Sequence, residues 1–132
     1  MAAAAIKGVI TITGKMKLCE AHAGVRALVP ITQMAFGDGG VDENGTPKAV
    51  MGDETALYNE LMRKNVGEPV FINDEHTTCR YSATLEKDDL VKKEISELAL
   101  YDSEGDMVMI QTFLRKGKDA GISQTYEVDE IF

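Results

Sequence analysis

The sequence lacks tryptophan, and aromatic residues of all kinds make up only 6% of its 132 residues. Leucine, isoleucine, valine, methionine and alanine must therefore fill any core. With 44% hydrophobic and 27% charged residues, the composition is that of a globular chain and not of a disordered one. A chain of this length can bury about two thirds of its unfolded surface, so it needs neither disulfides nor a metal to fold. We expect a single domain over residues 1–132.

Basic residues are also scarce, with 14 against 22 acidic ones and a formal net charge of −8. Proteins bind phosphate backbones with lysine and arginine, so this balance argues against nucleic acid and against an anionic membrane surface. No segment approaches the roughly 20 apolar residues that cross a bilayer. The start, Met1 to Gly8, lacks the basic stretch that opens a signal peptide. We expect synthesis in the cytosol, with the two cysteines as free thiols.

Most of the chain has the composition of β-strands. The β-branched and alternating patterns predict seven strands, over 6–13, 27–36 (starting after Pro30), 62–72, 77–86, 95–101, 107–114 and 122–128. Turn residues at 73–75 and 102–105 predict that the strands on either side of each form a hairpin.

Two short helices are expected between the strands. The first spans about 14–23, with Thr13 as its cap, Gly24 at its end, and an apolar face made by Met16, Cys19 and Ala23. The second spans 53–61 behind Asp53. Glycine, asparagine and proline between 37 and 54 predict a long exposed loop. The expected fold is α+β, with a mostly antiparallel or mixed β-sheet and two short helices in one compact domain.

All the cysteines and histidines of the chain fall in two mirrored pairs, Cys19 with His22 and His76 with Cys79. Such spacing can form a tetrahedral zinc site. Positions 76 and 79, however, lie at the mouth of a strand, where residues three apart point to opposite sides. The alternative is that the cysteines pack as small apolar side chains and the histidines lie on the surface. We favour this alternative and assign no metal.

Other motifs that could bind a ligand or support catalysis lack the neighbouring residues or elements that such sites need. The glycines at 37–40 are followed by more loop, whereas a phosphate-binding loop needs a helix directly behind it. An EF-hand template started at Asp42 meets Pro47 where it needs glycine and ends on Asp53 instead of glutamate. No spacing suggests a Ser–His–Asp arrangement. We therefore predict that the chain is not an enzyme and assign no catalytic or cofactor-binding residues.

Three stretches, in this order, resemble the phage tail-collar fibre family, the N-terminal region of many tail fibre proteins. The first is Ile-Thr-Gly at 12–14, before a helix, followed by Ile-Thr-Gln-Met-Ala-Phe-Gly-Asp-Gly at 31–39. The second is Thr-Ala-Leu-Tyr-Asn-Glu-Leu at 55–61, with Arg63. The third is Ile-Ser-Glu-Leu-Ala-Leu-Tyr-Asp at 95–102, with Gly105. Ser96 and Ala99 stand where the family often has arginine and glycine.

This resemblance implies a structural domain of a phage or prophage tail, in the virion, that attaches a fibre to the baseplate or tail tip. Its implied partners are phage tail or baseplate proteins and a separate fibre chain, with self-association as a further expectation. It implies no catalytic residue. From composition alone, an intracellular protein-binding module unrelated to phage is the alternative.

Overall fold

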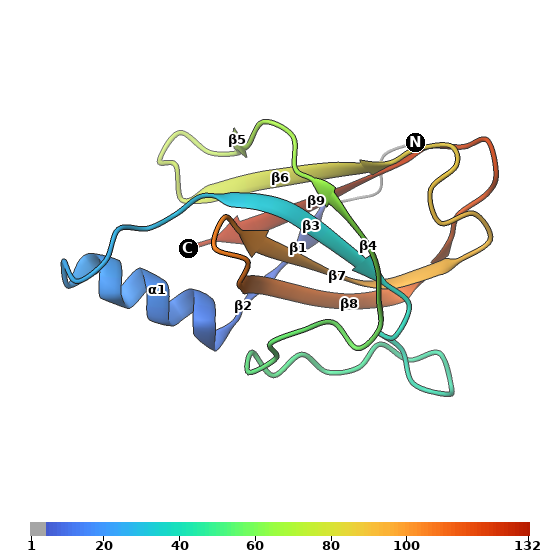
Figure 1. Ribbon diagram of the computed structural model, residues 1–132, viewed down its shortest axis with the longest axis horizontal. Helices are drawn as coiled ribbons and strands as arrows, with labels where there is room; N and C mark the ends of the chain where they lie inside the picture. The colour runs from blue at the N-terminus through green and yellow to red at the C-terminus, as the bar shows by residue number, and fades with distance from the viewer. Residues whose placement is uncertain (1–4) are drawn as a thin grey trace.

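The computed structural model describes residues 5–132 and folds this part of the chain into two β-sheets and a single α-helix (Figure 1). The four-stranded sheet contains, in spatial order, β1 (Ile6–Lys7), β9 (Gln124–Ile131), β6 (Thr78–Leu85) and β5 (Val70–Phe71). The five-stranded sheet contains β2 (Val9–Ile10), β8 (Met107–Gly117), β7 (Glu94–Asp102), β3 (Ile31–Gly37) and β4 (Glu60–Asn65). The helix, α1, spans Ile12–His22.

The first strand is divided between the two sheets. β1 pairs with β9 in parallel, whereas β2 and the other paired strands run antiparallel to their neighbours. Gly8 lies at the crossing, and a Cβ there would stand 2.0 Å from the sulfur of Met109. Only glycine lets the backbone pass this close to the core. The continuous strand predicted over 6–13 is wrong, because it is divided into β1 and β2 and its last two residues belong to α1.

The main core lies between the two sheets. Side chains from both inner faces meet there, and the ring of Phe36 on β3 packs 5.1 Å from that of Tyr126 on β9. The other buried members of this core are Met34, Ala83, Leu85, Ile95, Leu98, Leu100, Val108, Met109 and Val128. Aliphatic and methionine side chains therefore supply most of the packing, as the aromatic-poor composition requires.

A second, smaller core lies on the outer face of the five-stranded sheet. The segment between β3 and β4 runs across this face (Figure 1) and places Leu57 against Ala35, Ala99, Tyr101, Met107 and Ile110. Of the loop predicted over 37–54, Gly37 still belongs to β3 and residues 38–54 have no helix or strand, but Val41 within the loop is buried. This segment therefore forms a third layer over the sheet.

The predicted α+β class with two short helices is wrong, because the described chain is mostly β and has one helix. The helix predicted over 53–61 does not form. Its N–H groups at Tyr58 and Asn59 donate to the carboxylate of Glu97 on β7. Asp53 is not a cap, and Glu54 instead accepts the N–H groups of two preceding residues. Tertiary acceptors have replaced the intrahelical ones.

Other elements follow the predictions more closely. The β7–β8 hairpin is confirmed, with Gly105 at φ 86° in its turn. β5 and β6 form the predicted second hairpin, but the strand predicted over 62–72 is split, and its first part, β4, belongs to the other sheet. α1 begins earlier than expected, on a Thr11 cap. In residues 5–132 no helix is both long and apolar enough to span a membrane.

Candidate functional site

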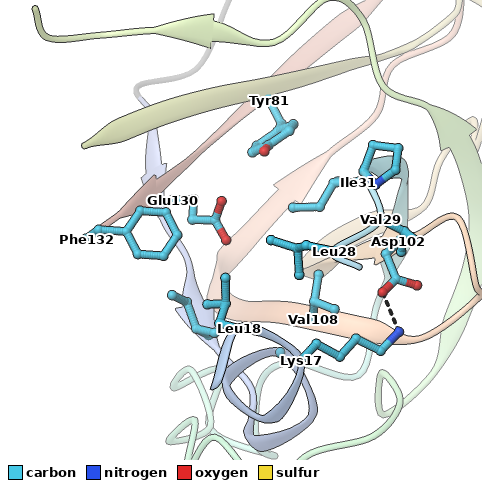
Figure 2. Close-up of a pocket in the computed structure, with 13 residues that line it drawn as sticks. Lys17, Leu18, Leu28, Val29, Ile31, Tyr81, Asp102, Val108, Glu130 and Phe132 are labelled. Carbon is cyan, nitrogen blue, oxygen red and sulfur yellow. Dashed lines mark hydrogen bonds and ion pairs between the residues drawn. The ribbon is translucent and has the colours of Figure 1, made fainter. Parts of the chain in front are cut away.

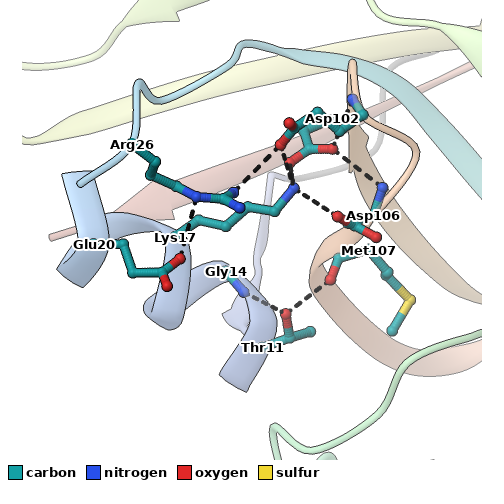
Figure 3. Close-up of polar contacts among 9 residues, drawn as sticks. Thr11, Gly14, Lys17, Glu20, Arg26, Asp102, Asp106 and Met107 are labelled. Carbon is teal, nitrogen blue, oxygen red and sulfur yellow. Dashed lines mark hydrogen bonds and ion pairs between the residues drawn. The ribbon is translucent and has the colours of Figure 1, made fainter.

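One end of the molecule carries α1, an adjoining pocket and an exposed apolar edge. The start of α1 is fixed by Thr11, whose side chain is fully buried. Its Oγ1 accepts the N–H of Gly14 at 3.1 Å and donates to the carbonyl of Met107 at 2.8 Å (Figure 3). A Cβ on Gly14 would stand 2.6 Å from the carbonyl oxygen of Val108. The cap and the glycine together hold the helix directly against β8.

One turn further along α1, Lys17 points into the turn between β7 and β8. Its Nζ lies 2.5 Å from Asp102 Oδ2, 2.7 Å from Asp106 Oδ2 and 2.9 Å from Glu104 Oε1. Burial alone would lower the pKa of Lys17, but its bonds to the carboxylates outweigh burial and raise that pKa above its ordinary value. Lys17 therefore stays charged and ties the helix to the hairpin.

The same three carboxylates lie close enough together to hold a metal ion. The ammonium of Lys17 lies among them and supplies the positive charge that three converging carboxylates require. Asp102 also accepts the N–H groups of Glu104 and Asp106 through its other oxygen. This arrangement is an internal ion cluster, and we assign no metal to it.

A pocket of about 420 Å³ opens between α1, the start of β3 and the end of β9 (Figure 2). Its wall is mostly apolar, and Leu28 on the α1–β3 connection is 53% exposed there. The wall is formed by Ile10, Gly14, Lys17, Leu18, Leu28, Val29, Pro30, Ile31, Tyr81, Asp102, Val108, Glu130 and Phe132. An apolar cavity with a few polar groups is the usual form of a binding site.

Glu130 is the carboxylate in this wall that lies outside the Lys17 cluster. It lies on β9, opposite Cys79 of β6 and close to the side chain of Tyr81. Burial raises the pKa of Glu130, although Tyr81 partly opposes this, and burial likewise raises the pKa of Tyr81. A partner that covered the pocket would remove Glu130 from water altogether, so it would need to supply a positive charge or a hydrogen-bond donor.

Exposed apolar side chains continue beyond the pocket along β5 and the end of β9. A second hollow there shares Tyr81, Glu130 and Phe132 with the first one. Its rim includes Phe71, whose ring stacks on that of His76 at 3.9 Å. The exposed apolar residues of this part are Val70, Phe71, Ile72, Ile131 and Phe132. We call these residues and the pocket the end face, and such patches commonly mark interaction sites.

The loop layer is fixed separately by Glu97, a fully buried carboxylate on β7. Its Oε2 accepts the N–H groups of Gly39 and Asn59, at 3.0 and 2.8 Å, and its Oε1 accepts that of Tyr58 at 2.8 Å. Three backbone donors compensate the charge that burial would otherwise penalise. Glu97 thus joins the two ends of the β3–β4 segment to the middle of the sheet.

The four residues considered for zinc do not come together. Cys19 is exposed on α1, whereas Cys79 is buried on β6 beside the second hollow. His76 lies in the β5–β6 turn, stacked on Phe71, and His22 ends α1. Among residues 5–132, the acidic trio at the β7–β8 turn is the one group of three or more metal-ligating side chains that converges.

The residues that organise the end face and the loop layer could not be identified from the sequence. Lys17 and Glu97 are single charges inside otherwise ordinary segments, and burial, which makes them important, depends on the tertiary fold. Glu130 is likewise a single charge in an ordinary segment, and its surroundings depend on the tertiary fold. A weak signal did exist for Glu97, which lies in the Ile-Ser-Glu-Leu stretch that resembles the tail-collar family.

Residues 5–132 form a β-sandwich of two sheets with an exposed apolar end face. The model of a protein family described as "Phage tail-collar fibre protein, N-terminal" matches residues 2–127, and the chain belongs to this family. It is therefore a structural domain of a phage tail that associates with other tail proteins. Neither the curated proteins nor the solved structures gave a match.

Proposed function

We propose that this domain attaches a tail fibre to the baseplate or tail tip and does so through the end face. The observation that carries the proposal is the pocket between α1 and the sheet ends, because it combines apolar walls with a carboxylate on a chain of the tail-collar family. The domain acts by binding and catalyses no reaction. A second candidate function has no comparable feature to support it.

The chemistry of the pocket defines the partner surface. Leu28 and Phe132 offer apolar contact, while Glu130 needs a cation or a donor once water is excluded. A lysine or arginine beside an aliphatic or aromatic side chain supplies both. The net charge of −8 favours approach to a basic surface and speeds the encounter at low ionic strength.

The experiment is a binding titration of the purified chain against each tail and baseplate protein of its own phage. We expect one of them to bind, and Leu28→Asp to weaken that binding by about ten-fold or more. Glu130→Gln should reduce its dependence on salt. The matched control is Leu114→Asp, because Leu114 is also exposed but lies six residues further along β8 than the pocket residue Val108. Equal losses in the Leu28 and Leu114 variants would contradict the proposal.

A further inference from the structure

The two sheets leave an open edge where β4 and β6 border the same hollow. β5 is two residues long and pairs only with the start of β6. Further along, Gly67 donates its N–H to the carbonyl of Ser82 at 2.8 Å, as the chain passes beside β6 on its way to β5 (Figure 1). Beyond this bond a hollow of about 540 Å³ lies between residues 63–67 and residues 82–86.

The free edge of β6 carries backbone groups that its own sheet does not use. The N–H and C=O groups of successive residues in a strand point to opposite sides. Because Ser82 bonds to Gly67, the groups of Thr84, two residues further on, point the same way and away from β9. The hydroxyls of Thr84 and Thr125 lie 2.8 Å apart, as expected for a pair that shares no backbone bond. Thr84 therefore offers one donor and one acceptor to an added strand.

β4 presents the same pattern from the other sheet. Val66 donates its N–H to the carbonyl of Thr32 on β3, so the backbone groups of Arg63 and Asn65 point away from β3. Both residues line the hollow. Within residues 5–132, neither of them nor Thr84 makes a backbone hydrogen bond outside the ladder of its strand. Unpaired groups of this kind are a template for a further strand.

Of the four strands at the sheet edges, β4 is the one long enough to pair with a further strand. It has six residues, whereas β1, β2 and β5 have two each, and β5 directly follows Pro69, which has no N–H. Long basic side chains often guard an edge. Here the guanidinium of Arg63 lies 3.6 Å from the centre of the Tyr101 ring, and Lys64 Nζ lies 2.7 Å from Asp89. Contacts within the chain thus engage both side chains.

We propose that an extended segment of another phage tail protein adds here as a strand between β4 and β6. Each strand of residues 5–132 already belongs to one of the two sheets, and proteins of this family associate with other tail proteins, so the segment comes from such a protein. At about 3.3 Å per residue, the stretch from Ser82 to Glu86 has room for roughly four residues. Backbone pairing of this kind is a recurring mode of peptide recognition.

The sheet also defines the side chains of the added segment. Ala83 is buried, so the residue opposite it turns its side chain towards the main core. The residue opposite Thr84 turns its side chain the other way, towards solvent. The segment should therefore alternate apolar and polar residues, and it should have no proline where an N–H must be donated.

The first test is hydrogen exchange of single N–H groups, measured by NMR in the chain alone and with each tail and baseplate protein of its phage. In the chain alone, exchange should be fast at Thr84 and Asn65 and slow at Ala83, whose N–H faces β9. One tail protein should slow exchange at Thr84 and Asn65 by about ten-fold or more. Slow exchange at Thr84 in the chain alone, or no slowing with any tail protein, overturns the proposal.

Proline variants test the free N–H groups directly. Thr84→Pro removes a donor that faces the hollow, while the bonds of β6 to β9 are made by the residues on either side. We expect it to weaken binding of that tail protein by about ten-fold or more, and Thr84→Val, which keeps the N–H, to bind like the native chain. Asn65→Pro and Asn65→Ser form the same pair on β4, and they decide the matter if thermal unfolding shows that Thr84→Pro is not folded. Folded proline variants that bind like the native chain overturn the proposal.

This inference does not rest on the proposed function. None of residues 63–67 and 82–86 lines either hollow of the end face. If a tail protein slows exchange at Phe71 of the end face and not at Thr84, the edge proposal fails and the pocket proposal stands. If exchange at Thr84 is slowed and Leu28→Asp binds like the native chain, the pocket proposal fails and the edge proposal stands. Slowing at Thr84 that grows with the concentration of the chain alone assigns the edge to a second copy and overturns the proposal.

Discussion

The ammonium of Lys17 lies 2.5 Å from a carboxylate oxygen of Asp102, and both side chains are 3% exposed. A buried ion pair is costly to break because the remaining charge has no partner and no water. We predict that Lys17→Met lowers the free energy of unfolding by about 3–5 kcal/mol, measured by urea denaturation. Arg26→Ala removes two more exposed ion pairs, with Glu20 and Glu104, and should cost less than about 1 kcal/mol. Similar losses in both variants would show that the cluster does not hold α1.

The same pair predicts how stability depends on pH. Burial would raise the pKa of Asp102, but Lys17 and the N–H groups of Asp106 and Glu104 together outweigh burial and hold that pKa below the ordinary 3.8. The pKa of Lys17 is raised above the ordinary 10.5. The stabilisation by Asp102 is present above pH 3.8 and is lost as the pH falls through the lowered pKa of this group. The stabilisation by Lys17 is present below pH 10.5 and is lost as the pH rises through the raised pKa of Lys17. We expect Lys17→Met to make the free energy of unfolding depend less on pH at both the acidic and the basic end, measured by denaturation at a series of pH values.

Glu97 should matter for the loop layer more than any other single carboxylate. Glu97→Gln replaces one accepting oxygen by an NH₂ group that faces backbone donors, so we expect a loss of about 3 kcal/mol in unfolding free energy. Hydrogen exchange at the N–H groups of Gly39, Tyr58 and Asn59 should accelerate more than exchange in β6. Glu94→Gln, at an exposed position on the same strand, is the control. Uniform acceleration over both sheets would argue against a local role.

Gly14 tests the contact between helix and sheet. Alanine favours a helix over glycine by about 1 kcal/mol, yet a Cβ at this position would stand 2.6 Å from the carbonyl oxygen of Val108. We therefore predict that Gly14→Ala destabilises the domain by roughly 1–3 kcal/mol in thermal denaturation. Gly117→Ala, where no atom lies within 4 Å, should be close to neutral. A stabilised Gly14→Ala variant would show that α1 can move away from β8.

The two thiols should differ in reactivity. Cys19 is exposed and Cys79 is buried, so an aromatic disulfide reagent should titrate one thiol per folded chain quickly and the second about ten-fold or more slowly. Denaturant should equalise them. Protection of both thiols that a chelator reverses would instead indicate the zinc site that the spacing of Cys19, His22, His76 and Cys79 allows.

The β-rich character and the hairpin of β7 and β8 could be predicted, because alternation and a Gly105 turn are local signals. The helix over 53–61 could not be excluded, since the groups that replace its hydrogen bonds come from Glu97, some 40 residues away. The end of α1 followed from Gly24, which adopts φ 77°. The start of α1 could not be predicted, because the side chain of Thr11 is held as the cap by its hydrogen bond to the carbonyl of Met107, which lies 96 residues further along the chain.

The pocket was beyond prediction for the same reason. Leu28 comes from the α1–β3 connection, whereas Tyr81 and Glu130 come from β6 and β9 of the four-stranded sheet, and no spacing in the sequence relates them. Resemblance to a family supplied what periodicity could not, namely the biological setting. The end face, in turn, could be identified only from the folded structure.

The parallel pairing of β1 with β9 sets an order of events during synthesis. β9 lies in the interior of its sheet, between β1 and β6, and contributes Tyr126 and Val128 to the main core. Until residues 124–131 have left the ribosome, β1 and β6 lack the neighbour that both require, whereas the β7–β8 hairpin can already close locally. The four-stranded sheet therefore cannot form before β9 has been synthesised, and apolar surface that β9 later covers stays exposed until then. We expect the nascent chain to aggregate most readily in that interval.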